Sequence, residues 1–411
     1  MSALSERSDS PTASRWAGLW LAVVLSLAAA VSLGVTRFSY ALLLPPMRDD
    51  LAWSYTLAGA MNTFNALGYL VGALTTPVLM RFWGPARLLV AGAALSSLFM
   101  AGSGFFVASE PLLAQRLLAG VSSAWVFISG GLLAAHLGSR WPHRSGLLLG
   151  IYYGGTGWGI VASALLVPWL LDTMAHRPHP WTWAWWMLAL LCALATVALA
   201  GVVRKCAPPP ARSSNASSPG TTSPTHRATW RAFGPALLGY SLFGMGYIGY
   251  MTFVVAVLRD HGTSTHRITL FYALLGLAVV ASSRLWSGLL DRHRGGQPLA
   301  RLCGLLGLAT VLPAWTTAWP LLLMSGLLFG AVFLSVVAST TALVRHNWPP
   351  DRWAAGISAF TVVFAIGQIV GPTVVGWIAD GPGGLQRGLM FSAIALWAGA
   401  IIAACQKPLA R

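Results

Sequence analysis

The stretch CAPPPARSSNASSPGTTSPTHR, residues 206–227, divides an otherwise apolar chain into two parts. It is rich in Pro, Ser and Thr, and it contains basic but no acidic residues. A segment of this composition cannot bury a hydrophobic core and is typical of a flexible linker. Six long apolar runs precede the stretch and six follow it. The sequence therefore predicts two similar helical units, residues 17–203 and 233–405, joined by a linker over residues 204–232.

The apolar runs are long enough to cross a bilayer. The 411-residue chain is 56% hydrophobic and 9% charged, whereas a soluble protein carries about 25% charged residues. About 20 apolar residues cross a hydrocarbon core of ~30 Å, and each such segment must satisfy its own backbone hydrogen bonds, as a helix does. The expected spans cover residues 17–44, 54–80, 87–108, 111–138, 146–171, 182–203, 233–258, 268–290, 298–318, 320–344, 353–379 and 386–405.

The formal net charge of +16 is distributed unevenly between the two sides of this arrangement. With residues 1–16 and 406–411 as cytoplasmic tails, eighteen Lys and Arg residues fall on the cytoplasmic side and five on the outer side. This asymmetry follows the positive-inside rule. It predicts a multi-pass protein of the plasma membrane, in a bacterium the inner membrane, with both termini in the cytoplasm. It also removes the reason to expect nucleic acid as a partner.

The two halves also resemble each other in sequence. Pro111-Leu-Leu opens the fourth span and Trp141-Pro142 closes it, while Pro320-Leu-Leu opens the tenth span and Trp348-Pro349 closes that one. Repeated halves are typical of transporters, in which two bundles move around a central site. A membrane receptor would normally add a signalling domain, which we do not find. The chain has neither a nucleophile elbow nor a metal-ligand spacing of Cys and His, so we expect no enzyme, cofactor or metal.

Several motifs are similar to those of the major facilitator superfamily, whose loop motif runs roughly Gly-x-x-x-Asp-Arg-x-Gly. SGLLDRHRGG, residues 287–296, keeps Asp291 and Arg292, while VLMRFWGPAR, residues 78–87, keeps Gly84 but has Arg81 in place of the aspartate. The strings GVTRFSYALLLPPM, GYLVGAL, GYSLFGMGYIGYMTF and GQIVGP most resemble YbfB/YjiJ-type permeases. The resemblance implies an all-α polytopic membrane protein with twelve transmembrane helices in two pseudo-symmetric six-helix bundles. It also implies rocker-switch alternating access.

The same resemblance implies that the two loop motifs govern the conformational switch. The expected gating residues are Asp291, Arg292, Arg284, Gly84 and Arg87, with Arg284 as a partner of Asp291. The first loop lacks the aspartate, so a gating salt bridge is expected only at the second loop.

Arg37 is the only charged residue between Trp16 and Leu44. Pro45-Pro46 is expected to end this helix, which would place Arg37 about 9 Å below the outer surface at 1.5 Å per residue. One interpretation is a side chain that snorkels to the surface or contacts Asp49 or Asp50. The other is a guanidinium that faces a substrate cavity, because no carboxylate lies within any predicted span. In that case Arg37 would attract an anion and bind a carboxylate through two donors.

Other polar residues lie in the predicted spans. The resemblance implies that the first, fourth, seventh and tenth helices line the pathway, which would place Arg116 near the pathway too. A structural contact of Arg116 to a backbone carbonyl is the alternative. Tyr240, Tyr247 and Tyr250 fall close to one helical face. They and Gln368 are candidate substrate-binding residues, although tyrosines packed between helices would show the same spacing. Asn62 and Asn65 more often form interhelical hydrogen bonds.

We therefore predict a secondary active transporter, expected to be a monomer, that moves a small solute, with an organic anion favoured. The alternative is proton-coupled efflux of hydrophobic or cationic compounds, suggested by the glycine-rich stretch Gly150–Gly159 in the fifth span. A coupling proton would have to be carried by the substrate's own carboxyl group, a histidine, or a helix-end acid such as Asp49, Asp50 or Asp380. The expected partners are thus the solute, the lipid bilayer and a coupling proton.

Overall fold

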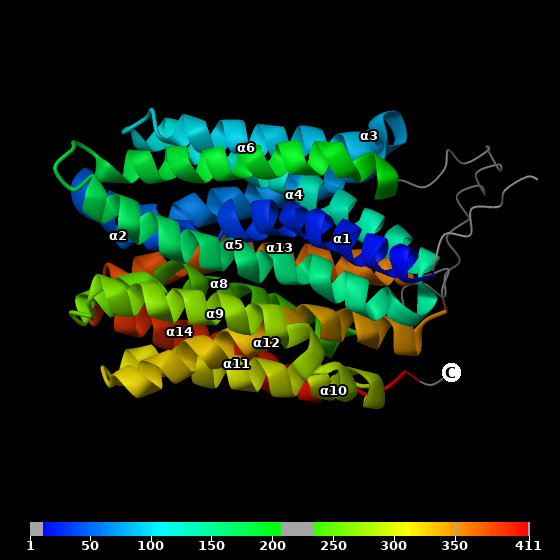
Figure 1. The fold of residues 1–411 in the computed structure, drawn as a ribbon. Helices are drawn as coiled ribbons and strands as arrows, with labels where there is room; N and C mark the ends of the chain where they lie inside the picture. The colour runs from blue at the N-terminus through cyan, green and yellow to red at the C-terminus, as the bar shows by residue number, and fades with distance from the viewer. Residues whose placement is uncertain (1–10, 207–232, 350–351, 410–411) are drawn as a thin grey trace, which may run out of the picture.

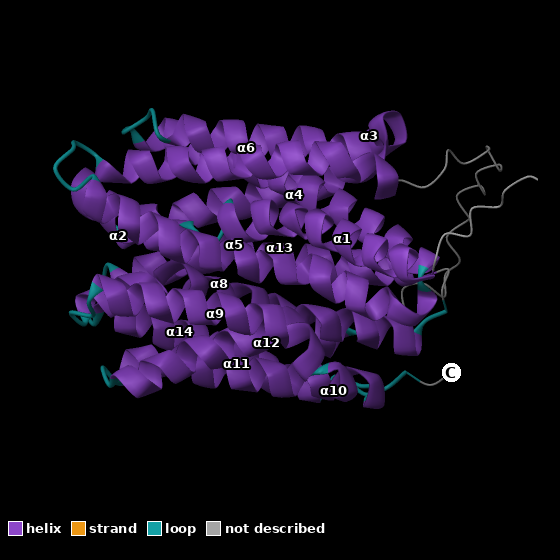
Figure 2. Cartoon of the chain, in the orientation of Figure 1, coloured by secondary structure: helices purple, strands orange, loops and turns teal. Residues whose placement is uncertain are grey.

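The computed structural model describes residues 11–206, 233–349 and 352–409. Within these ranges the chain forms helices joined by short loops, with no strand (Figure 2). Most of the predicted linker, residues 207–232, lies outside the described residues.

The first half begins with a membrane span made of three pieces. These are α1 (Pro11–Ala29), the π-helical segment η1 (Ala30–Val35) and α2 (Tyr40–Leu51). It continues with α3 (Tyr55–Ser103), α4 (Ser109–Arg140), the 3-10 turn η2 (Pro142–Arg144), α5 (Ser145–Thr173) and α6 (Pro180–Cys206).

The second half repeats this plan. It consists of α8 (Gly234–Asp260), α9 (Thr265–Leu285), the short α10 (Ser287–Arg292), α11 (Gln297–Trp315), α12 (Trp319–Asn347), α13 (Trp353–Ala379) and α14 (Gly384–Ala404).

The helix α3 contains two membrane spans. Its 49 residues would extend about 74 Å as a straight helix, more than twice the hydrocarbon thickness. Gly84 breaks it with φ 72° and ψ 160°, a backbone conformation that glycine adopts far more easily than other residues. The described residues contain 11 helices long and apolar enough to cross a membrane. With α3 counted as two spans, these give the twelve predicted crossings.

The predicted end of the first span at Pro45-Pro46 is wrong, because α2 continues through both prolines to Leu51. Membrane helices tolerate proline when neighbouring structure satisfies the freed backbone groups. The irregularity lies earlier, where Thr36 N–H donates to Val31 and Phe38 N–H to Leu33, each five residues back. Arg37 therefore sits in a widened turn inside the span. It precedes Leu51 by fourteen residues, or about 21 Å, so it is much deeper than expected.

The two halves lie side by side (Figure 1), in contact through α2 with α8, α3 with α13, and α5 with α9. The start of α1 and the finish of α14 lie at the same end of the bundle, at the right of Figure 1. We call this the inner end. The opposite end, where α2, α8 and α13 finish, is the outer end.

Glycines allow the halves to approach closely at mid-span. A Cβ atom added at Gly157 of α5 would lie under 3.0 Å from the carbonyl oxygen of Gly276 in α9, and the converse also holds. Gly155 and Gly159 similarly meet backbone atoms of Ser26 and Ala30. The glycine-rich stretch of the fifth span therefore serves helix packing, for which small residues are favoured in membranes.

Candidate functional site

Arg37 is buried where the two halves meet, with 3% of its surface exposed. Its Nη2 donates a hydrogen bond of 2.8 Å to Oε1 of Gln368 in α13. The amide nitrogen of Gln368 donates in turn to the hydroxyl of Tyr247 in α8. The guanidinium also lies 5.8 Å from the ring centroid of Tyr69. Arg37, Gln368 and Tyr247 thus form one polar chain that joins the first half to the second.

The surface interpretation of Arg37 does not agree with this geometry. A snorkelling side chain would be exposed at the membrane boundary, whereas Arg37 is enclosed. The two acids considered as its partners lie at the far end of α2 and have other partners: Asp49 pairs with Arg48 at 3.2 Å, and Asp50 contacts His179 at 2.6 Å.

Arg116 of α4 forms a second polar chain between the halves. Its Nη1 donates to the backbone carbonyl of Thr36 at 2.8 Å, and its Nη2 donates to Oδ1 of Asn62 at 3.0 Å. The Asn62 amide then donates to the hydroxyl of Thr252 in α8 at 2.8 Å. Asn65 donates to the Arg116 carbonyl. The structure therefore shows the backbone-carbonyl contact considered for Arg116, as well as the interhelical bonds of both asparagines.

The two arginines place uncompensated positive charge in the interior. Arg37 and Arg116 lie close enough to repel each other electrostatically. Their hydrogen-bond acceptors are the side-chain amide oxygens of Gln368 and Asn62 and the backbone carbonyl of Thr36, all of which are neutral. The Nε atom of each arginine is buried without a partner. Removing a charge from water costs several kcal/mol even after relaxation. No acid among the described residues forms an ion pair with either arginine to offset this cost. The ion pairs that the described residues do form, Arg48–Asp49 and His179–Asp50, lie at the outer end.

The three candidate tyrosines of α8 do not share one environment. Tyr240 and Tyr247 stack with Phe243 and Phe364 at interplanar angles of 14–22°. The hydroxyl of Tyr250 instead forms a 2.8 Å hydrogen bond with Ser325 inside the second half. At 100° per residue, Tyr250 is rotated about 80° from Tyr240. Only Tyr247 of the three joins the Arg37 chain.

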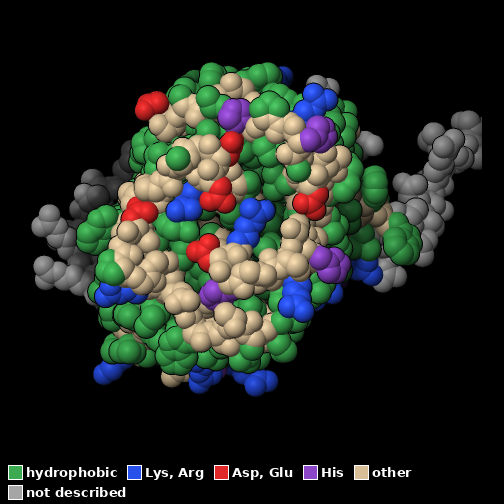
Figure 3. Space-filling model, turned by 90° about the vertical axis from the view of Figure 1, so that its left-hand side faces the viewer, with side chains coloured by type: hydrophobic (Ala, Val, Ile, Leu, Met, Phe, Trp, Pro, Cys, Tyr) green, Lys and Arg blue, Asp and Glu red, His purple; other side chains and the backbone are tan. Residues whose placement is uncertain are grey.

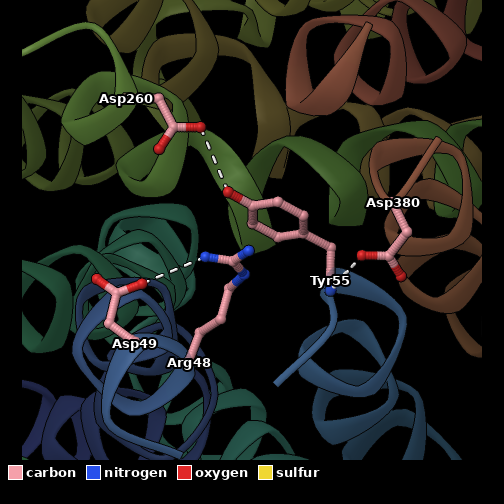
Figure 4. Close-up of polar contacts among 5 residues, drawn as sticks. All are labelled: Arg48, Asp49, Tyr55, Asp260 and Asp380. Atoms are coloured by element: carbon pink, nitrogen blue, oxygen red, sulfur yellow. Dashed lines mark hydrogen bonds and ion pairs between the residues drawn. The ribbon is translucent and has the colours of Figure 1, made fainter. Parts of the chain in front are cut away.

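A second set of contacts between the halves lies at the outer end (Figure 4). Asp380, just after α13, accepts hydrogen bonds from the backbone N–H groups of Tyr55 and Thr56 at 2.7 and 2.9 Å, and another from the Thr56 hydroxyl. It therefore caps the N-terminus of α3. The Tyr55 hydroxyl donates to Asp260 at 3.3 Å, and Arg48 lies 3.9 Å from the centre of the Tyr55 ring. These contacts hold the halves together at this end.

Figure 3 looks onto the outer end and shows basic side chains in the middle of the face with acidic side chains around them. Burial of the Asp380 carboxylate raises its pKa. The hydrogen bonds from Thr56 and Tyr55 outweigh that effect, however, and hold the pKa of Asp380 below its ordinary value of 3.8. Asp380 is therefore ionised at neutral pH, as a cap at the positive end of a helix should be.

The predicted gating residues lie at the inner end and are not joined by an ion pair in the described structure. Asp291 and Arg292 end α10, and both are exposed. Arg284 is exposed in the last turn of α9, and the expected ion pair with Asp291 is absent. Arg87 is exposed as well, whereas Gly84 has the definite structural role of ending the first span of α3.

Sequence reasoning did not identify the contacts that join the halves. Thr56, Tyr55 and Asp260 were not singled out, and Asp380 was considered only as a proton carrier. Asp380 and Thr56 are 324 residues apart, and neither has a distinctive neighbouring motif. The one local signal is Ser54, whose side chain accepts from Leu57 N–H and marks the beginning of α3.

Solved structures with this architecture are transporters of the major facilitator fold. A point mutant of the nucleoside transporter NupG has a TM-score of 0.72 and 12% sequence identity, covering 94% of this chain and 99% of that one. An inward-facing, unoccupied bacterial homologue of the human lysosomal transporter Spinster has a TM-score of 0.64 and 15% identity, covering 94% and 95%. At these identities the likeness shows the fold alone.

The fold is thus that of a polytopic, all-helical membrane protein with two similar halves, and the sequence comparison adds the family. The family model described as "Uncharacterised MFS-type transporter YbfB" matches residues 29–404, and the chain belongs to this family. No curated protein sequence matches it. The protein is accordingly a multi-pass membrane transporter that acts on a small-molecule substrate.

Proposed function

We propose that this transporter carries a small organic anion by alternating access, with Arg37 and Arg116 as its anion-binding residues. The observation that carries the proposal is the buried pair of guanidinium groups, which have neutral hydrogen-bond partners and an unpartnered Nε each. A bound carboxylate would supply the missing negative charge and accept from these donors, as charge-assisted bidentate pairs do.

The two polar chains suggest how binding would be linked to movement. Arg37 reaches Gln368, and Asn62 carries the Arg116 chain to Thr252, so both chains cross between the halves. When the halves separate, the Arg37–Gln368 and Asn62–Thr252 bonds break, and the Arg37 donor becomes available to the solute, while Arg116 keeps its partners Thr36 and Asn62 in the first half. The anion then binds best in a state in which Gln368 has moved away from Arg37. A ligand shifts a conformational equilibrium only through such differential affinity.

Proton-coupled efflux of cations is the competing function. It has less support, because a cation would meet two positive charges, and the α5 glycines that suggested it pack against Ser26, Ala30 and Gly276. If a proton is coupled to anion transport, the substrate's own carboxyl group can carry it. We further propose a monomer in a bacterial inner membrane with both termini cytoplasmic. The charge asymmetry supports the orientation, and the start of α1 and the finish of α14 lie at the same end of the bundle (Figure 1).

The test begins with thermal stability of the purified protein in detergent. A ligand that binds the folded state raises the melting temperature. Three panels are compared: small mono- and dicarboxylates, lipophilic cations, and nucleosides, the last because NupG is described as a nucleoside transporter. The solutes that raise the melting temperature are then followed in flux measurements with proteoliposomes.

The proposal predicts stabilisation and flux with carboxylates, and loss of both in Arg37→Ala. Arg177→Gln, a change at an exposed arginine between α5 and α6, is the matched control and should behave as wild type. Stabilisation by cations or nucleosides alone, with flux of the same compounds, would overturn the anion assignment while leaving the transporter class intact.

A further inference from the structure

The helices α5 and α9, which come from different halves, separate toward the inner end. One stripe of α5 carries glycines at 157, 154 and 146. A Cβ at Gly157 would lie under 3.0 Å from the Gly276 oxygen, and one at Gly154 would lie 3.6 Å from Val280. A Cβ at Gly146 would have nothing within 4 Å. The two helices therefore enclose a wedge that widens from mid-span toward the inner end.

This wedge contains a cavity of about 750 Å³ between α1, α5 and α9. Its lining is mainly apolar and includes Leu27, Leu277 and Val280. Two of the residues that line the cavity are also exposed on the outside of the bundle: Trp158 is 54% exposed and Leu285 is 61% exposed. In a membrane these exposed apolar surfaces face acyl chains, so the wedge opens toward lipid.

Arg284 is the one charged residue that lines the cavity. It is exposed, lies in the last turn of α9, and forms no ion pair with any described acid. No acidic side chain is present among the lining residues. A basic group at the end of a membrane helix lies at the depth of the phospholipid headgroups, where it attracts anionic ones.

We propose that the wedge binds one anionic phospholipid of the inner-end leaflet, with its phosphate on Arg284 and an acyl chain in the cavity. The apolar lining favours a lipid over a soluble phosphate, and the unpaired guanidinium favours an anionic over a zwitterionic headgroup. Because the walls belong to different halves, the lipid site exists only in conformations in which α5 and α9 are apart at this end. The site is separate from the Arg37 chain and does not depend on the proposed substrate.

The experiment measures lipid retention by native mass spectrometry. The purified protein is mixed with equal amounts of phosphatidylglycerol and phosphatidylcholine of the same chain length. Wild type should retain phosphatidylglycerol preferentially. Arg284→Gln should weaken that retention about fivefold, the effect of one basic group near an anionic lipid surface. Arg81→Gln changes an exposed arginine of α3 that does not line the cavity, and it should retain the lipid as wild type does.

A second variant tests the cavity itself. Ala281 is exposed and lines the wedge, so Ala281→Phe fills the space with little demand on folding. It should reduce retention while Arg284 remains in place. Equal retention of the two lipids by wild type, or unchanged retention in both Arg284→Gln and Ala281→Phe, would overturn the proposal. So would binding of glycerol phosphate as strong as that of the lipid, because the site would then be for a soluble ion. Lipid retention is measured without any solute, so this result does not depend on the test of Arg37.

Discussion

Asp380 and Thr56 join the two halves of the transporter at the outer end. The carboxylate of Asp380, which follows α13, accepts hydrogen bonds from the backbone N–H and the hydroxyl of Thr56 in the first turn of α3. A helix N-terminus carries unpaired N–H groups and partial positive charge. An acid from one half therefore satisfies donors that the other half cannot satisfy by itself, and it does so only while the outer end is closed.

Removing this cap should favour opening of the outer end. In Asp380→Asn the side chain loses its charge, and its remaining oxygen accepts fewer bonds. The open population should rise about tenfold or more, because hydrogen bonds to a charged group contribute about 1.5–3 kcal/mol. The measurement is the distance between spin labels at Thr173 and Ser264, which are exposed at the outer end of different halves. Glu110→Gln is the control, because the Glu110 side chain contacts Ser109 within the first half. An unchanged distance distribution in Asp380→Asn would show that the cap does not hold the gate.

The pH dependence of this closure follows from the lowered pKa of Asp380. Because the pKa of Asp380 is lowered in the closed state, the ionised carboxylate stabilises closure at every pH above its ordinary pKa of 3.8. This stabilisation is lost as the pH falls through the lowered pKa of the closed state. The difference in open population between wild type and Asp380→Asn should therefore stay constant from about pH 5 to pH 8. The same spin-label distances measure it. A step within that range would assign the pH response to another group and would contradict the Asp380 account.

Arg37 should be essential for solute binding if the anion assignment is correct. Truncating one member of a buried charge pair costs about 2–5 kcal/mol, which corresponds to roughly thirtyfold or more in the dissociation constant. Arg37→Ala should therefore abolish measurable binding, and Arg37→Lys should recover only part of it, because lysine lacks the planar pair of donors. Binding is measured on monodisperse protein in detergent. Wild-type affinity in Arg37→Ala would mean that Arg37 only connects the halves through Gln368.

Arg116 provides a comparison within the same site. If it binds the anion together with Arg37, Arg116→Ala should weaken solute binding to a similar extent. If it only supports Thr36 and Asn62, the melting temperature should fall while affinity stays within a few fold. Measuring both quantities on the same preparation distinguishes the two roles.

The mid-span contact between α5 and α9 should be sensitive to a single methyl group. Gly157→Ala would place a Cβ under 3.0 Å from the Gly276 oxygen, a backbone atom that cannot rotate away. Overpacking of this kind typically costs about 1–3 kcal/mol. Gly146→Ala, on the same helix with nothing within 4 Å, should be neutral or slightly stabilising. Thermal unfolding of the two variants in one detergent tests the pair. Equal melting temperatures would show that the helices move apart at no cost.

The orientation of the bundle can be tested with a reporter that is active only in the periplasm. Fused after Arg411, or within residues 213–223, the reporter should be silent, because the charge asymmetry predicts that both sites are cytoplasmic. Fusion in the loop between α8 and α9, at Gly262, should give a strong signal. The reverse pattern would invert the topology and with it the names of the two ends.

The membrane architecture was determined by the sequence itself. Span length, the lack of charge within the spans and the linker between two sets of six runs predicted nearly every helix. These features were sufficient because the bilayer requires each segment to satisfy its own backbone hydrogen bonds. Whether a segment forms a membrane helix therefore depends on its own residues. The predicted helix end at Pro45 and Pro46 was wrong, because the helix continues through both prolines and the irregular backbone lies at residues 30–39 instead.

The partners of the polar residues were decided only by the tertiary structure. The sequence showed that Arg37 has no acid within its span, but not that it reaches Gln368, 331 residues away. Nor did it show that Asp380 caps α3 or that Tyr250 turns away from Tyr247. A side-chain partner depends on the rotation and depth of both helices, and those are fixed by packing contacts such as Gly157 on Gly276, to which both halves contribute. Helix packing in a membrane is set by the shape of the surfaces that meet, and that shape does not exist until both halves have folded.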